Sequence, residues 1–188
     1  MCVNIFWDNS YIWLVGKNVC AQKEKGLEAL FRIHFANRFE FCRQKWQVSY
    51  AFLAGSVPPA TDELWSRISE LGIQIITQER GKYQNNEVAV DEIIQLKMAN
   101  RILDYEPPET IYLLTGDGQG HNQGIEFIPQ LERAVKRNWK IEVISWGIGC
   151  NKALREFASS NGVFRELEPV YENVTFIEDY RLAKPFKQ

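Results

Sequence analysis

The sequence predicts an α/β fold with a central, mainly parallel sheet of about five strands flanked by helices. Short apolar runs alternate with amphipathic segments along the chain, which is the pattern of consecutive βαβ units. The length of 188 residues suits one domain, and 45% apolar and 24% charged residues are close to the globular average. We expect one domain over residues 1–160 and a C-terminal extension, 161–188, that packs on it or trails from it.

The first part of the chain begins with an apolar strand at residues 3–7, which stops at Asp8. A loop follows, and apolar side chains at helical spacing then predict a helix from about residue 24 to 43. Residues 47–54 (QVSYAFLA) predict the second strand, which a glycine and a proline pair close. This part of the chain is therefore expected to form a strand, a loop, a helix and a second strand.

The middle of the chain continues the alternation. Thr61 is the expected N-cap of a helix that ends at Gly72, and residues 73–77 form the third strand. A polar loop precedes a long helix from about residue 87 to 105, which a second proline pair terminates. The long helix would cross back over the sheet, as βαβ units require.

The last part of the chain supplies the remaining elements. Residues 110–115 (TIYLLT) predict the fourth strand and lead into a glycine-rich turn. A helix is expected at 125–137, the fifth strand at 140–146 and a short helix at 151–159. Residues 163–188 are strand-like at first and then irregular and charged.

Acidic side chains stand at positions where a parallel sheet binds ligands. In open parallel sheets, ligands bind in the crevice outside the carboxyl ends of the strands, and Asp8 and Asp117 follow the first and fourth strands. Asp91 lies near the start of the long helix, with Glu87 on the same helix face. Three carboxylates brought together there would repel one another unless a cation compensates. Hard oxygen ligands without soft ligands nearby favour Mg²⁺ or Mn²⁺.

Each acid also has a purely structural interpretation. Asp8 could be a turn residue or a helix cap, Asp91 could favour the positive end of a helix, and the Gly-Asp-Gly around Asp117 could be a turn. Their combination at matching topological positions favours the metal site. An ion held there would polarise a phosphoryl oxygen and lower the pKa of a bound water, as phosphodiester hydrolysis needs.

Charge and cysteine content narrow the class of protein. The net charge is −2 and the pI is near 5.8, so the chain lacks the overall positive charge of a protein that coats nucleic acid. Any nucleic-acid contact would therefore be local. The four cysteines have no C-x-x-C spacing, and with two histidines, of which His34 is expected inside a helix, a zinc site is disfavoured. We expect a cytoplasmic protein without membrane contact. The cysteines are expected to be free thiols, and we expect neither a leader at the N-terminus nor an apolar run long enough to span a membrane.

Three short acidic strings resemble those of a known family. They lie at residues 5–10 (IFWDNS), 87–92 (EVAVDE) and 114–118 (LTGDG), and a further stretch, 124–146, follows them. In this order and spacing they resemble the NYN domain family of PIN-like nucleases over about residues 3 to 160. The resemblance implies a three-layer PIN-like fold and metal-dependent cleavage or processing of RNA.

The resemblance also assigns roles to residues. Asp8 would match the first acid, Asp91 the middle acid and Asp117 the acid of the fourth-strand motif, with Asn9 and Ser10 as the polar residues beside the first. Many relatives carry another acid two residues after the last of these, where this chain has Gln119. We expect His121 or Glu87 to substitute in part.

The leading hypothesis is a Mg²⁺- or Mn²⁺-dependent endoribonuclease. Asp8, Asp91 and Asp117 would be the catalytic and metal-binding residues, and five polar residues would support them: Asn9, Ser10, Glu87, Gln119 and His121. The substrate would be single-stranded RNA, bound by cations near its phosphates and by aromatic side chains that stack on bases. The expected RNA-binding residues are Arg80, Lys82, Lys97, Tyr11 and Trp13, with Tyr83 beside them.

Other functions remain open at this point. Gln119 and the mildly acidic charge favour a catalytically weak or inactive RNA-binding or interaction module. A metal-dependent phosphatase is disfavoured, because its usual D-x-D motif would need a second acid after Asp8, and Asn9-Ser10 follows instead. The aromatic residues Phe31, Phe35 and Phe39 could form a homodimer interface or belong to the core.

Overall fold

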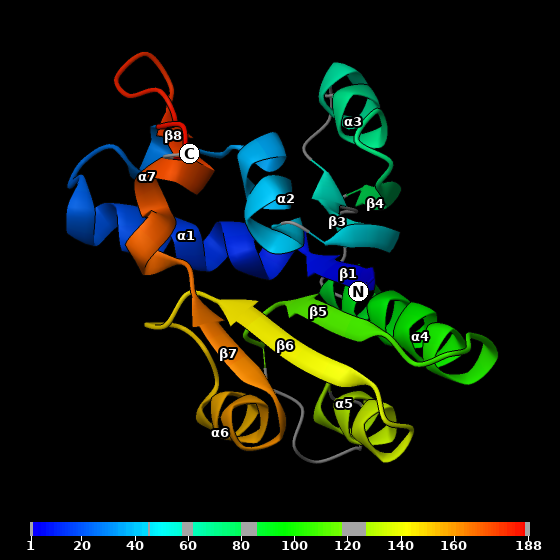
Figure 1. Cartoon of the computed structure of the whole chain (residues 1–188). Helices are drawn as coiled ribbons and strands as arrows, with labels where there is room; N and C mark the ends of the chain where they lie inside the picture. Colours follow the sequence, from blue (N-terminus) through cyan, green and yellow to red (C-terminus); the bar gives the residue numbers. More distant parts are fainter. Residues whose placement is uncertain (1, 45, 58–61, 80–85, 118–126, 187–188) are drawn as a thin grey trace.

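The structure, a computed structural model, describes residues 2–44, 46–57, 62–79, 86–117 and 127–186. They form an α/β fold around a six-stranded sheet in which every neighbouring pair of strands is parallel (Figure 1). The predicted fold class is confirmed, with one strand more than expected. The strands of this sheet are β1 (Cys2–Asp8), β3 (Gln47–Val57), β4 (Gln74–Glu79), β5 (Thr110–Leu114), β6 (Lys140–Ser145) and β7 (Val163–Glu166).

Two layers of helices cover the sheet, because side chains alternate between the faces of each strand. Val3, Ile5 and Trp7 of β1 face one core, and Phe6 faces the other. Helices α4, α5 and α6 cover the second face (Figure 1). The helices are α1 (Asn9–Lys23), α2 (Phe35–Arg43), α3 (Asp62–Ser69), α4 (Asn86–Asp104), α5 (Phe127–Lys136), α6 (Lys152–Asn161) and α7 (Tyr171–Val174), with short 3-10 helices η1 (Glu28–Leu30) and η2 (Glu168–Val170).

The strand order is β4-β3-β1-β5-β6-β7. The chain starts in the middle of the sheet, moves outward to β4, and then returns through α4 to place β5 on the other side of β1. The order therefore reverses between β1 and β5. In open α/β sheets the crevice outside the carboxyl ends of the strands at such a point is the usual place for a ligand.

The segment after β1 differs from the sequence-based expectation. The expected loop is helix α1, and the helix expected over residues 24–43 starts only at Phe35. Asp8 caps α1 by accepting a hydrogen bond from the backbone N–H of Tyr11, so the strand passes directly into the helix. Between the two helices, β2 (Phe31–Ile33) pairs with the distant β8 (Thr175–Ile177). This long-range pairing replaces the helix that the local spacing suggested.

Two expectations about side chains in this segment also change. His34 lies outside the helix as the N-cap of α2, and its Nδ1 accepts a hydrogen bond of 3.1 Å from the N–H of Asn37. Phe31 and Phe39 are buried in the core of the α1–α2 face, and Phe35 packs against it. The structure thus places these aromatic rings in or against the core of the single chain.

The residues after 160 contribute to both sheets. β7 pairs with β6 as the sixth strand of the main sheet, and β8 belongs to the small antiparallel sheet. Gly162 precedes β7, where a Cβ atom would overlap the backbone carbonyl of Ile141. A residue without a side chain is therefore needed where the chain enters the sixth strand.

A fully buried arginine lies in the core of the α1–α2 face. The guanidinium carbon of Arg38 is 5.2 Å from the ring centroid of Trp7 and 5.8 Å from that of Trp146. Within the described part of the chain, its side-chain nitrogens have no hydrogen-bond acceptor. Burial disfavours the charged form and lowers the pKa of Arg38 to about 9. The two indole rings are its main favourable electrostatic partners.

No helix in the described residues combines the length and the apolar character that crossing a membrane would require.

Candidate acidic site at the sheet edge

Two of the predicted acids lie on neighbouring strands at the same edge of the sheet. Asp8 is the last residue of β1, and Asp117 follows β5, which pairs with β1 in parallel register. The strand order reverses between β1 and β5, which lie side by side in Figure 1. The sequence-based placement of Asp8 and Asp117 at neighbouring strand ends therefore agrees with the topology.

The side chain of Thr115 links the two acids. Its hydroxyl donates a 2.9 Å hydrogen bond to Oδ2 of Asp8, and the backbone N–H of Asp117 donates to the same hydroxyl at 3.2 Å. Oδ1 of Asp8 accepts from the N–H of Tyr11 at 3.0 Å. Asp8 is only 2% exposed, so these contacts fix its orientation. It serves as the helix cap and as one half of the acid pair.

Electrostatics make Asp8 an unusual carboxyl group. Burial raises its pKa from 3.8 to about 6, the hydrogen bonds from Tyr11 and Thr115 oppose that rise, and the negative charge of Asp117 adds to it. Asp8 consequently keeps its proton to a higher pH than an ordinary carboxyl group does. A cation between the two carboxylates would relieve both the desolvation of Asp8 and the repulsion from Asp117.

Tyr11 forms a wall beside the acid pair. Its hydroxyl donates a short hydrogen bond to the carbonyl of Gly149, and burial raises its pKa. Gly116 has no room for a side chain, because a Cβ would lie 2.8 Å from the Tyr11 hydroxyl and would overlap Oγ of Ser145. Tyr11 is thus anchored against the backbone. Trp13, also expected to bind RNA, is half-buried on α1, with the ammonium of Lys17 4.8 Å from its ring centroid.

The third predicted acid, Asp91, is half-buried in the first turns of α4. Helix α4 packs against β1 and β3 and connects β4 to β5, so its N-terminal end lies toward the carboxyl edge of the sheet. In the described ranges, no three histidine, cysteine, aspartate or glutamate side chains lie close enough together to hold a metal ion. The described geometry therefore supplies a pair of acids at this edge.

The polar residues Asn9 and Ser10 follow Asp8 and begin α1. Asn9 is buried, and its amide oxygen has no hydrogen-bond donor among the residues that the structure describes. The side chains of Asn9 and Ser10 both lie against Gly55 of β3, where a Cβ would be 3.1 Å from Cβ of Asn9. The carboxylates of Asp8 and Asp117 are hard oxygen donors, and the buried amide oxygen of Asn9 belongs to the residue that follows Asp8. Such oxygen donors fit Mg²⁺ or Mn²⁺ better than a softer ion.

Several predicted residues cannot be placed relative to the acid pair. Their side chains lie outside the described residues: Arg80, Lys82, Tyr83, Glu87, Gln119 and His121.

Lys97 is described, but it lies away from the acid pair. It lines a cavity with Tyr50 of β3, and Tyr50 pairs with Asn4, four residues before Asp8 along β1. Sequence reasoning also missed Thr115, which was assigned only as the end of a strand. Its one signal was a hydroxyl two residues before an expected acid.

Comparison with known proteins supplies a structural relative. No protein-family model and no curated protein matches the chain. The fold is similar to the crystal structure of a protein of unknown function from Vibrio parahaemolyticus, with a TM-score of 0.58 and 14% sequence identity over 89% of this chain and 93% of that one. The chain thus has the parallel α/β fold of that protein, and at this identity the likeness shows the fold alone.

Proposed function

We propose that the chain is a divalent-metal-dependent endoribonuclease of the NYN type that cleaves single-stranded RNA at the carboxyl edge of β1 and β5. The observation that carries the proposal is the pair Asp8 and Asp117, joined through the Thr115 hydroxyl where the strand order reverses. Acids in this position, one of them with a raised pKa, are typical of functional sites. The resemblance of the three acidic strings to that family adds support.

The chain's own residues have distinct tasks in this proposal. Asp8 and Asp117 would hold Mg²⁺ or Mn²⁺, and the bound ion would supply Lewis acidity and a hydroxide near neutral pH. Thr115 holds the Asp8 carboxylate in one orientation. Tyr11, fixed by Gly149, closes one side of the site. Asn9 offers its buried amide oxygen to the outer shell of ligands.

Cleavage of single-stranded RNA in the presence of Mn²⁺ tests the activity. Asp117→Asn should lower the rate at least about tenfold, because even outer partners of a metal site contribute that much. Asp179→Asn is the matched control, since Asp179 is an exposed acid after β8 with a φ of 61° that asparagine adopts readily. If Asp117→Asn cleaves as fast as the parent chain, the proposal is wrong.

Metal binding can be measured without cleavage. Thermal melts during a Mn²⁺ titration should show stabilisation of about 2.7 kcal/mol when the ion reaches one hundred times its dissociation constant. The stabilisation should be lost in Asp117→Asn and kept in Asp179→Asn. If the melting temperature of the parent chain does not change with Mn²⁺, the chain has no working metal site.

A second candidate function, an RNA-binding module without cleavage, has its own support. Both carboxylate oxygens of Asp8 already accept hydrogen bonds, and the described residues supply two acids to the edge rather than three. For such a module, RNA binding would persist in EDTA, would be unchanged in Asp117→Asn, and would not be followed by cleavage with Mn²⁺.

A further inference from the structure

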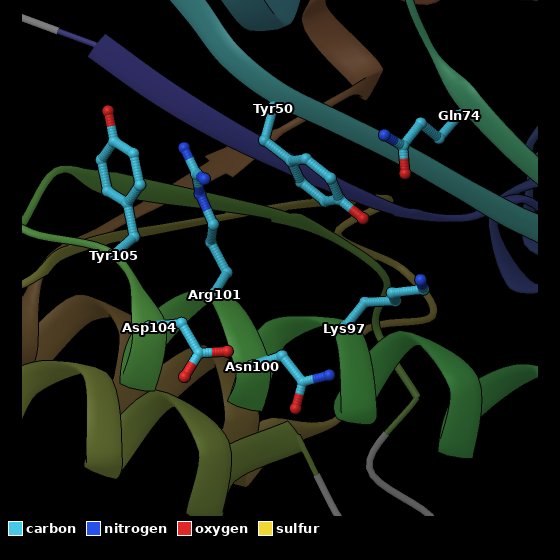
Figure 2. Close-up of a pocket in the computed structure, with 7 residues that line it drawn as sticks. All are labelled: Tyr50, Gln74, Lys97, Asn100, Arg101, Asp104 and Tyr105. Atoms are coloured by element: carbon cyan, nitrogen blue, oxygen red, sulfur yellow. The ribbon is translucent and has the colours of Figure 1, made fainter.

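A second polar region lies under α4, away from the acid pair. A cavity of about 280 Å³ opens between the C-terminal half of α4 and the strands β3 and β4. Tyr50 of β3 and Gln74 of β4 line one side, and four residues of α4 and Tyr105, which directly follows α4, line the other (Figure 2). The cavity contains cationic, amide and hydroxyl groups together, so it is suited to a polar ligand.

Arg101 is held rigidly at this cavity. Its Nε donates a 2.7 Å hydrogen bond to Oδ1 of Asn4, which is fully buried on the central strand. The guanidinium carbon is 3.5 Å from the ring centroid of Tyr105 and 5.6 Å from that of Tyr50. Figure 2 shows the guanidinium between the two rings. These contacts fix the orientation of Arg101. Its guanidinium carries further N–H donors besides the one that binds Asn4.

A second layer of hydrogen bonds supports this arrangement. Glu109 lies 3.9 Å from a terminal nitrogen of Arg101 and accepts hydrogen bonds from Asn4 Nδ2 at 2.7 Å, Ser49 Oγ at 2.9 Å and Tyr105 OH at 3.3 Å. The side chain of Glu109 is only 10% exposed. Buried ionic networks of this kind add little stability compared with an apolar core. What this network achieves is the positioning of Arg101.

Lys97 adds a second positively charged side chain to this cavity. Its ammonium is 5.8 Å from the ring centroid of Phe52, and among the described residues it has no ion-pair partner. Glu109 is already engaged with Arg101, and Asp104 is the one carboxylate among the residues that line the cavity. Figure 2 shows Asp104 and Lys97 separated along α4, with Asn100 between them. An anion in this cavity would therefore meet the Lys97 ammonium and, next to it, the N–H donors that Arg101 keeps beyond its contacts with Asn4 and Glu109.

We propose that this cavity binds a phosphate group of the RNA strand, as a contact separate from the acid pair. The assignment rests on the proposed function for its source of phosphate. Tyr50 and Ala54 of β3 pair with Asn4 and Asp8 of β1, so the cavity lies about four residues, or roughly 13 Å, from the acid pair along the strands. One extended RNA strand can reach both places, with Lys97 and Arg101 gripping its backbone. Asn100, Gln74 and the Tyr50 hydroxyl supply further hydrogen-bonding groups.

Binding of a fluorescein-labelled oligouridylate to the full chain, measured by anisotropy in EDTA, tests the contact without cleavage. Lys97→Met keeps the aliphatic stem and removes the charge, so the affinity at low salt should fall about tenfold. The slope of log K against log salt should also decrease in magnitude by about 0.7, the value for one phosphate contact on a single strand. Lys152→Met is the matched control, because Lys152 is 88% exposed on α6, and it should change neither quantity.

The outcomes separate this site from the acid pair and identify the source of the phosphate. Asp117→Asn should bind the oligouridylate as the parent does in EDTA, so a failure to cleave RNA leaves this result standing. Inorganic phosphate and uridine monophosphate serve as competitors. Lys97→Met could lose binding of inorganic phosphate and uridine monophosphate but keep the parent's affinity for the oligouridylate. That result would overturn the RNA assignment in favour of a small phosphorylated ligand. Equal affinity of parent and Lys97→Met for every probe overturns the phosphate site itself.

Discussion

Asp8→Asn should stabilise the chain at neutral and alkaline pH when no metal is present. Burial raises the pKa of Asp8 from 3.8 to about 6, and this difference corresponds to about 3 kcal/mol between the protonated and the ionised side chain. The folded state binds the proton more tightly than the unfolded state. The stability that the protonated group confers is therefore fully present below about pH 4 and is lost as the pH rises through about 6.

Asparagine reproduces the protonated form of Asp8 at every pH. Its amide oxygen can still accept the hydrogen bond from the N–H of Tyr11 that caps α1, and asparagine caps helices as well as aspartate does. Its amide nitrogen can donate toward the Thr115 hydroxyl, as a protonated carboxyl would. The substitution should raise the free energy of unfolding by up to about 3 kcal/mol at about pH 8 and leave it unchanged near pH 4.

Urea unfolding in EDTA across this pH range measures the effect. Asp179→Asn, which removes an exposed acid, should show no comparable dependence on pH. A variant that is less stable than the parent at about pH 8, or a difference that does not vary with pH, would refute the reasoning. Mn²⁺ should stabilise the parent alone, because asparagine lacks the charge that the ion would neutralise.

Three further predictions concern packing and the environment of the acid pair. Gly162→Ala should lower the free energy of unfolding by about 1–3 kcal/mol, because the added Cβ would overlap the carbonyl of Ile141; an unchanged urea midpoint would contradict this. Arg38→Met should raise the free energy of unfolding by about 1–4 kcal/mol, since an apolar side chain avoids burying an isolated charge; a lower melting temperature would mean that the indole rings compensate for that charge. Thr115→Val should raise the pKa of Asp8 further by removing a donor to its carboxylate, and an unshifted Asp8 carboxyl resonance in an NMR pH titration would disprove this.

The strands in the interior of the main sheet could be predicted because both of their faces are buried. Strands buried on both faces of a parallel sheet carry nearly continuous apolar runs, and β5 is buried along its whole length. The expected strand at 110–115 and the expected helix at 87–105 correspond closely to β5 and α4 (Asn86–Asp104). Fold class and strand ends follow from such local patterns.

The segment between β1 and β3 was mispredicted for a physical reason. Local spacing in residues 24–43 resembles a helix, but Phe31–Ile33 gains more by pairing with Thr175–Ile177, more than 140 residues away in sequence. A contact over such a separation leaves no local pattern. Helix α1 is a different case, because its cap is local: Asp8 accepts a hydrogen bond from the backbone N–H of Tyr11, three residues further on, so the interpretation of Asp8 as a helix cap was correct.

The sequence by itself determined the parallel α/β fold and the position of Asp8 and Asp117 at strand ends, since both depend on patterns within single elements. Tertiary structure alone decided that Thr115 joins the two acids, that burial brings the pKa of Asp8 to about 6, and that Arg101 is fixed by Asn4. These properties arise from desolvation and hydrogen bonds between residues that are distant in sequence. Only the packed chain brings such residues into contact.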